Sequence, residues 1–176
     1  GSLRRGLALR ASERDLVAEA SGGAPAGRRL SPLGFDAGTP AQLDEVMRTG
    51  LLQLVVDRLD KDEFEVQKEA AWVLANVMHG YQTDPTLHAA NRVRTLVQLG
   101  CIGPMVNMLD KNNPATQKLV LDALANLLSA GEELGKAKGE NEFTKAFDEA
   151  VGLDKLEGLQ EHKNADIYNK VRAASP

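Results

Sequence analysis

The clearest pattern of hydrophobic and polar positions lies in residues 66–77, where apolar side chains recur at helical intervals. The stretch contains neither Gly nor Pro, and most of its residues are good helix formers. Intervals of three and four residues place the apolar side chains on one face of a helix. These positions are Val66, Ala70, Val73, Leu74 and Val77. The pattern predicts an amphipathic helix with one buried stripe.

Beside that stripe, the same helix carries a second set of residues, Glu69, Trp72 and Asn76, on one ridge. Residues three or four positions apart lie one turn above another on a helix. An indole face can hold the stem and charge of a Lys or Arg, and an amide can pair with both polar groups of a passing backbone. The ridge therefore favours binding of an extended peptide. The plainer alternative is that Trp72 is a half-buried packing residue and Asn76 an ordinary surface residue.

The pattern recurs fifty residues later without a gap. Residues 66–77 align with residues 116–127, and the alignment extends back so that residues 50–61 match 100–111. Asp122 stands at the position of Trp72. Identical pairs include Gln67 and Gln117, Lys68 and Lys118, Ala75 and Ala125, and Asn76 and Asn126. A third copy begins at residue 152 and reaches residue 168. Self-similarity at such a period indicates stacked repeats, in which each unit needs neighbours to bury its apolar face.

Each unit is a short helix, a Gly, a second helix, a loop and a longer third helix, and this order resembles the armadillo repeat. More closely, several motifs in the same order resemble the C-terminal part of importin-α, the adaptor that binds nuclear localisation signals. The resemblance covers roughly residues 39–172. The motifs are residues 68–72 with Asn76, residues 98–102 followed by Pro104, residues 152–157, and residues 160–164 with Ile167 and Tyr168.

This resemblance implies an all-α fold, an armadillo-type right-handed α-solenoid of about three repeats plus a leading helix. We expect the third helices to line a concave groove. Its peptide-binding residues would be Glu69, Trp72, Asn76, Asp122 and Asn126. In importin-α the matching Trp–Asn pair borders the minor signal site, so we expect weak cargo binding by this stretch alone.

The resemblance also implies a set of partners and a location. It implies basic, Lys/Arg-rich cargo peptides, together with importin-β, the export receptor and a nucleoporin through the full-length protein. It implies shuttling between cytoplasm and nucleus. An alternative function is a docking surface for the export receptor or the nucleoporin, which would use residues 120–170 rather than Trp72. Another alternative is a different armadillo scaffold protein.

Breaks in the pattern predict the domain boundaries. We expect a leading helix of a truncated repeat over residues 1–20, a flexible loop over 21–38, and armadillo repeats over 39–173, divided into 39–80, 83–131 and 141–173. Gly80 is expected to end the Trp72 helix in the left-handed conformation. A separate basic segment is the alternative for residues 1–20.

The N-terminal region departs from the family. If Gly22 matches Gly80, Arg14 and Ala18 occupy the Trp and Asn positions, which importin-α usually keeps. We therefore expect any peptide site formed there to be weak.

Charge is distributed unevenly along the 176 residues. Residues 1–35 hold six Arg against three acidic residues, whereas the remainder holds 15 basic and 22 acidic residues. An acidic array disfavours nucleic acid and favours a basic partner, although plain solubility is an equally simple explanation. The chain has no run of 18 apolar residues, so we expect no membrane span. Exposed stacking surfaces make self-association possible.

Catalytic motifs are absent from the sequence. It contains neither a Gly-rich phosphate loop nor a Cys/His cluster, and its carboxylates are scattered. His79 and His88 lack metal-ligand spacing, and Cys101 is expected to be small apolar filler. We expect no enzyme activity, no cofactor and no metal. Low aromatic content, 4 %, agrees with a helical array rich in Leu, Ala and Val.

Overall fold

The computed structural model describes residues 40–83, 85–150, 152–161, 163–164 and 167. The leading helix expected over residues 1–20 and the loop expected over 21–38 lie outside these residues, as does most of the last segment after residue 164.

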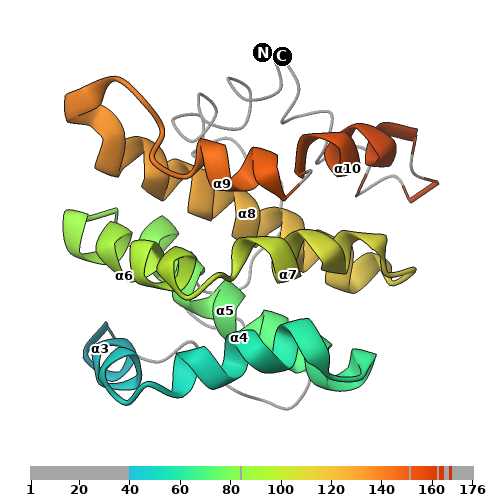
Figure 1. Cartoon of the computed structure of the whole chain (residues 1–176), viewed down its shortest axis with the longest axis horizontal. Helices are drawn as coiled ribbons and strands as arrows, with labels where there is room; N and C mark the ends of the chain where they lie inside the picture. Colours follow the sequence, from blue (N-terminus) through green and yellow to red (C-terminus); the bar gives the residue numbers. More distant parts are fainter. Residues whose placement is uncertain (1–39, 84, 151, 162, 165–166, 168–176) are drawn as a thin grey trace, which may run out of the picture.

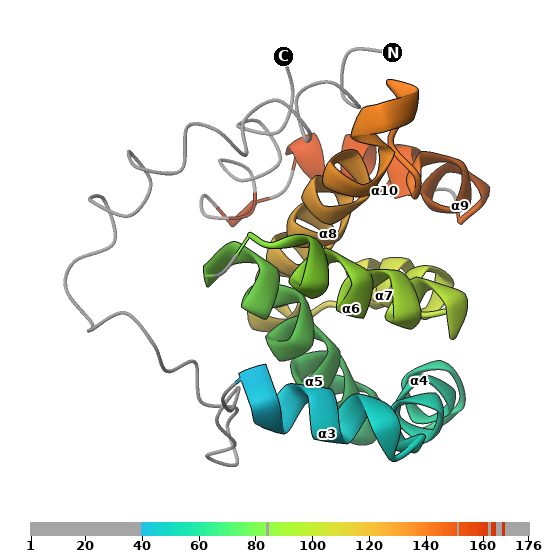
Figure 2. The same ribbon diagram turned by 90° about the vertical axis from the view of Figure 1, so that its left-hand side faces the viewer.

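Helices stack in three layers, each formed by one repeat unit (Figure 1). The first unit contains α3 (Pro40–Arg48), α4 (Leu51–Lys61) and α5 (Phe64–Thr83). A short break at Gly50 and a loop before Phe64 separate these helices. Figure 2 shows α3 and α4 at one end of the stack, with α5 running behind them toward the next layer.

The second unit repeats this arrangement. It contains α6 (Leu87–Gln98), α7 (Ile102–Asn107), the 3₁₀ turn η2 (Met108–Asp110) and α8 (Pro114–Gly135). Thr86 caps α6, because its hydroxyl accepts the backbone N–H of Ala89, and Asn113 caps α8 through the N–H of Thr116.

The third unit follows a further 3₁₀ turn, η3 (Lys136–Lys138). It contains α9 (Thr144–Glu149), α10 (Gly152–Gly158) and the turn η4 (Leu159–Glu161). All regular elements in the described part of the chain are helical. The all-α solenoid expected from the sequence is confirmed.

Two structural details recur at the fifty-residue period. Gly50 and Gly100 both adopt positive φ, 73° and 84°, between the first and second helices of their units. Left-handed backbone favours Gly because it lacks a Cβ atom. The Nε2 of Gln67 donates to the carbonyl of Leu59, and the Nε2 of Gln117 donates to the carbonyl of Leu109, each over 2.9 Å. These bonds fix the start of each third helix to the end of the second.

A continuous core runs through the stack between the second and third helices. Its fully buried side chains include Leu74 and Met78 from α5 and Leu124 and Leu127 from α8. Cys101 is fully buried, and burial raises the pKa of its thiol to about 12. A thiol with this pKa is a poor nucleophile, so the expected role as apolar filler fits the structure.

Gly80 differs from the sequence expectation, because α5 does not end there. The helix continues to Thr83, and Gly80 is not among the glycines with positive φ. A Cβ atom at Gly80 would lie 3.4 Å from Cδ1 of Leu43 and 3.6 Å from Nη1 of Arg92. The position is therefore a close but ordinary packing contact between α5 and the neighbouring first helices. The expectation of a left-handed stop was wrong.

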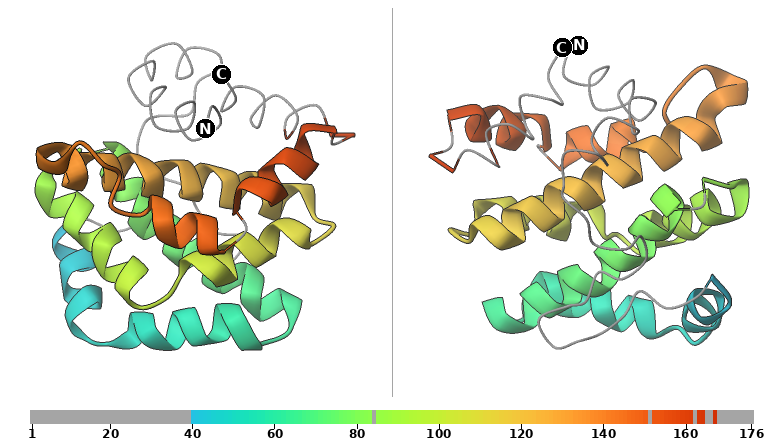
Figure 3. Two further views of the ribbon diagram at one scale, coloured as in Figure 1. Left: turned by 45° about the horizontal axis from the view of Figure 1, so that its top comes forward. Right: turned by 180° about the vertical axis from the view of Figure 1, so that it is seen from behind.

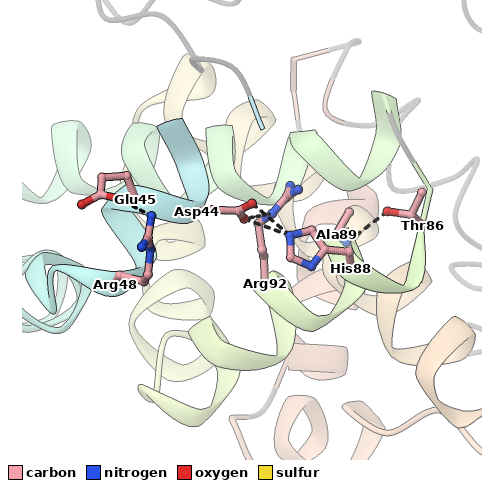
Figure 4. Close-up of polar contacts among 7 residues, drawn as sticks. All are labelled: Asp44, Glu45, Arg48, Thr86, His88, Ala89 and Arg92. Carbon is pink, nitrogen blue, oxygen red and sulfur yellow. Dashed lines mark hydrogen bonds and ion pairs between the residues drawn. The ribbon is translucent and has the colours of Figure 1, made fainter. Parts of the chain in front are cut away.

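Ionic links join each unit to the next. The carboxylate of Asp44 on α3 accepts a hydrogen bond from Nε of Arg92 on α6 at 2.8 Å and lies 3.0 Å from Nε2 of His88 (Figure 4). Arg94 on α6 forms two 2.8 Å bonds with the carboxylate of Glu142 just before α9. The Arg92 side chain is only 5 % exposed, so its pairing with Asp44 offsets a substantial cost of desolvation.

Candidate peptide-binding groove

The third helices α5 and α8 lie side by side and form the largest helix contact of the described stack (Figure 3). A small depression opens between them. Its lining contains two asparagines, an aspartate and a histidine among small apolar residues. The lining residues are Ala75, Asn76, His79, Leu119, Asp122, Ala123 and Asn126.

Three of the residues expected from the sequence meet in this depression: Asn76, Asp122 and Asn126. Asn76 comes from α5, whereas Asp122 and Asn126 lie one turn apart on α8. The two amides therefore face the same hollow rather than opposite sides of the molecule. The Trp-to-Asp replacement between units places a carboxylate beside both amides.

Both amides are more deeply buried than an exposed ridge would be. Asn76 is 7 % exposed and Asn126 is 9 % exposed. The Oδ1 atom of Asn76 is buried and has no hydrogen-bond partner among the described residues. Burial of an amide oxygen without a partner carries a cost in free energy.

Trp72 and Glu69 lie earlier on α5 and do not line the depression. The Trp72 indole is half-buried and packs against the hydrophobic core, and Glu69 is also half-exposed. Trp72 therefore has the packing role that the sequence left open, and its role in peptide binding stays a prediction.

His79 is a lining residue that the sequence analysis missed. It was assessed from the sequence as a metal ligand, and Gly80 was expected to end the helix, but α5 continues to Thr83. His79 lies three residues after Asn76, so it shares the face of α5 that meets α8. This i, i+3 spacing is the signal that would have placed it in the groove.

The described residues offer no group of three or more His, Cys, Asp or Glu side chains suited to a metal ion. Within the same residues, every helix is too short or too polar to cross a lipid bilayer.

Comparisons with known proteins bear on this geometry. The armadillo/beta-catenin-like repeat matches residues 39–79 and 91–129, and an atypical armadillo repeat matches residues 141–173. The chain belongs to the armadillo-repeat family. Its repeats are of the importin-α kind, as the sequence motifs led us to expect. Members of this family are binding and transport adaptors and are not enzymes.

Individual relatives agree with this assignment. Importin subunit alpha-4 of Arabidopsis thaliana is 34 % identical over 137 residues, which is 76 % of this chain and 24 % of the relative. Importin subunit alpha-3 of Caenorhabditis elegans is 36 % identical over 78 residues, which is 44 % of this chain and 14 % of the relative. The chain therefore spans less than a quarter of the length of these relatives.

A solved structure supports the fold independently. A computationally designed armadillo repeat protein for modular peptide recognition superposes with a TM-score of 0.62 at 29 % identity. The match covers 78 % of this chain and 51 % of the designed protein.

Proposed function

We propose that this chain binds basic, Lys/Arg-rich peptides of the nuclear localisation type in the groove between α5 and α8, as part of a nuclear import adaptor. Asn76 and Asn126 would hold the peptide backbone, Trp72 would receive an aliphatic stem, and Asp122 would pair with a cationic side chain. Glu69, beside Trp72, would add a second carboxylate at the edge of the groove.

The meeting of Asn76, Asp122 and Asn126 in one depression is the observation that carries this proposal. An extended peptide presents backbone N–H and C=O groups to such amides without any requirement on its side chains. Asn126 lines the same hollow, so a second amide can meet the same peptide further along. Two amides in one hollow suit a backbone better than they suit a compact small molecule.

Charge gives the preference for basic partners. Asp122 supplies a carboxylate next to both amides, and residues 36–176 carry 15 basic and 22 acidic residues. Complementary charge raises the rate of encounter and disfavours acidic sequences. Binding should therefore weaken as salt increases.

A fluorescence titration with a labelled bipartite Lys/Arg-rich peptide tests the proposal. Asn76→Ala should weaken binding about fivefold to tenfold, because one or two hydrogen bonds to the peptide are lost. Asn112→Ala is the matched control, since Asn112 is exposed in the loop before α8 and does not line the groove. Equal losses in both variants, or none in either, would contradict the proposal.

Trp72→Ala is a second arm of the same titration. We expect a loss of several-fold for the bipartite peptide, because the indole would contact the stem of one basic side chain. Circular dichroism checks that the fold survives, since the indole also packs on the core. A variant that folds and binds the peptide with the affinity of the wild type would remove Trp72 from the site.

For a longer protein that contains these repeats, we propose shuttling between cytoplasm and nucleus with importin-β, an export receptor and a nucleoporin as partners. The alternative function, docking of the export receptor on the last unit, draws little support from Lys155, because this residue is already paired within the chain. Its side chain is 20 % exposed, and its ammonium group donates to Asp110 at 2.6 Å and to Asn107 at 3.0 Å, which ties α10 to the second unit. A pull-down with the export receptor and its GTPase would separate the two functions: docking requires binding that survives in Trp72→Ala.

A further inference from the structure

A second hollow lies between α3 and α6, the first helices of the first and second units, and we call it the α3–α6 cleft. Its volume is about 510 Å³, which is within the range of ligand sites in proteins. The α3 wall contributes Asp44, Met47 and Arg48. None of the residues that line this cleft lines the depression between α5 and α8, so the two hollows are separate places on the molecule.

The cleft carries more positive than negative charge. Its lining includes Arg48, Arg92 and His88, and a single carboxylate, that of Asp44. Both oxygens of this carboxylate are engaged, since Oδ1 accepts from Nε of Arg92 at 2.8 Å and Oδ2 lies 3.0 Å from Nε2 of His88 (Figure 4). Arg92 is buried beside Asp44, so their two charges largely cancel. Arg48 is the charge left over, although residues 36–176 as a whole are acidic.

Arg48 is held only by a surface ion pair. Its guanidinium contacts the carboxylate of Glu45 one turn earlier on α3 (Figure 4). The Arg48 side chain is 74 % exposed, and ion pairs in such surroundings contribute little free energy. The guanidinium can therefore turn toward a ligand at small cost. Its planar fork of N–H groups matches the two oxygens of a carboxylate.

The α6 wall presents a row of polar side chains rather than a single point. His88, Asn91, Arg92 and Thr95 follow helical spacing along one face and span about 10 Å of the helix axis. Oδ1 of Asn91 accepts from Nη1 of Arg94 at 2.6 Å, so a ligand that meets this amide meets its donor, Nδ2. An extended chain advances about 3.3 Å per residue, so three or four residues match the length of the row. A lone phosphate or carboxylate group would meet only part of it.

We propose that the α3–α6 cleft binds an extended acidic segment, rich in Asp and Glu, of a partner protein. Arg48 pairs with one carboxylate of the segment, while His88 and Asn91 donate to the oxygens that follow. A basic segment would find only a carboxylate that Arg92 and His88 already occupy. This preference is opposite to that of the groove between α5 and α8, so the same molecule can hold a basic and an acidic segment together.

A fluorescence anisotropy titration with a labelled octapeptide of glutamate, at about 50 mM salt, tests the proposal on the full chain. Arg48→Ala should weaken binding about fivefold, because a charge-assisted bidentate contact is lost. Arg58→Ala is the matched control. Arg58 is also exposed, at 56 %, and pairs with Asp62 within one turn, but it lies on α4 outside the cleft. The six Arg of residues 1–35 are present in both variants, so their general attraction is the same.

Two further arms sharpen the assignment. His88→Ala should weaken binding of the glutamate peptide about twofold to threefold, because a donor is lost and Asp44 is less well neutralised. Inorganic phosphate should displace the labelled peptide at least about tenfold less effectively than unlabelled peptide at equal concentration, because it reaches only part of the row of donors. Circular dichroism checks that each variant keeps its helices.

Three results would overturn the proposal. Arg48→Ala and Arg58→Ala could lose affinity equally, which would assign the binding to general attraction, or neither could lose any. Phosphate could displace the peptide as well as unlabelled peptide does, which would make the cleft a site for small anions. Arg48→Ala should bind the bipartite basic peptide as the wild type does, so this proposal and the groove between α5 and α8 succeed or fail separately.

Discussion

The helices α5 and α8 occupy equivalent places in successive units, and they differ at the depression between them and at the end of the stack. Each begins with a Gln bonded to a preceding carbonyl, and each carries an Asn at the same position in the depression. Trp72 in α5 becomes Asp122 in α8. Val66 and Val73 are exposed on α5, whereas their counterparts on α8 are buried.

This comparison separates two kinds of position. Gln67 and Gln117, which join the second and third helices of each unit, are identical and make the same contact. Residues that face the groove vary around a constant Asn. A repeat protein can thus change the side chains offered to a partner while the scaffold stays the same.

The largest expected effect concerns the ends of the two helices. A Cβ atom at Gly135, at the end of α8, would lie 1.6 Å from the backbone oxygen of Glu140, so Gly135→Ala should destabilise the fold by about 3 kcal/mol. Gly80→Ala should instead stabilise it by about 0.5 kcal/mol, because Gly80 is inside α5 and Ala130 holds its place in α8. Urea unfolding measures both. If both substitutions change the free energy of unfolding in the same direction, the proposed difference between Gly80 and Gly135 is wrong.

The next effect tests whether the Gln bonds are equivalent. Gln67→Met and Gln117→Met should each lower the free energy of unfolding by about 1–2 kcal/mol, because a buried carbonyl loses its donor. Gln53→Met is the control, since that amide bonds to Asp57 on an exposed surface. Free energies of unfolding from urea titrations that differ by more than about 1 kcal/mol between the two variants would show that the units are not equivalent.

A smaller effect concerns the position that changes from Trp to Asp. Asp122→Asn should weaken binding of the basic peptide about fivefold at low salt, and the loss should shrink as salt increases. Asp57→Asn removes the same charge from α4 outside the groove and should leave binding unchanged. If the two variants lose affinity equally, general attraction rather than the groove explains the preference for basic peptides.

The smallest effect is the acid response of the ionic links. Hydrogen bonding from His88, together with the Arg92 guanidinium, lowers the pKa of Asp44 below its ordinary value of 3.8. A pKa that is lower in the folded state stabilises the fold above the ordinary value, and this contribution is lost as pH falls through the lowered one. Asp44→Asn should therefore flatten the decline in melting temperature below about pH 4. A decline as steep as in the wild type would show that Asp44 contributes little.

The sequence predicted those features of the fold that recur at the fifty-residue period. The fifty-residue period located Asn76 and Asn126 correctly as equivalent residues, and the structure places both in one depression. The family match confirms the armadillo units. The division into domains and the individual roles of the peptide-binding residues stay predictions.

The features that were missed depend on contacts between units, which a pattern along one helix does not contain. His79 enters the groove because α5 extends beyond Gly80, and Gly80 can stay helical there because α3 and α6 approach it closely without clashing. The burial of Asn76 results from α8 packing beside it. The ionic pairs Asp44–Arg92 and Arg94–Glu142 join residues 48 positions apart on different helices, and the pattern along one helix did not reveal them.

Those ionic links have a mechanical consequence. Asp44 with Arg92 and Arg94 with Glu142 each join one pair of adjacent repeat units. The rigidity of each junction therefore depends on its own ion pair. Loss of the ion pair between the first two units would change how α5 and α8 are spaced, and with it the separation between Asn76 and Asn126. The affinity of the proposed peptide site would then depend on an ion pair that lies outside it.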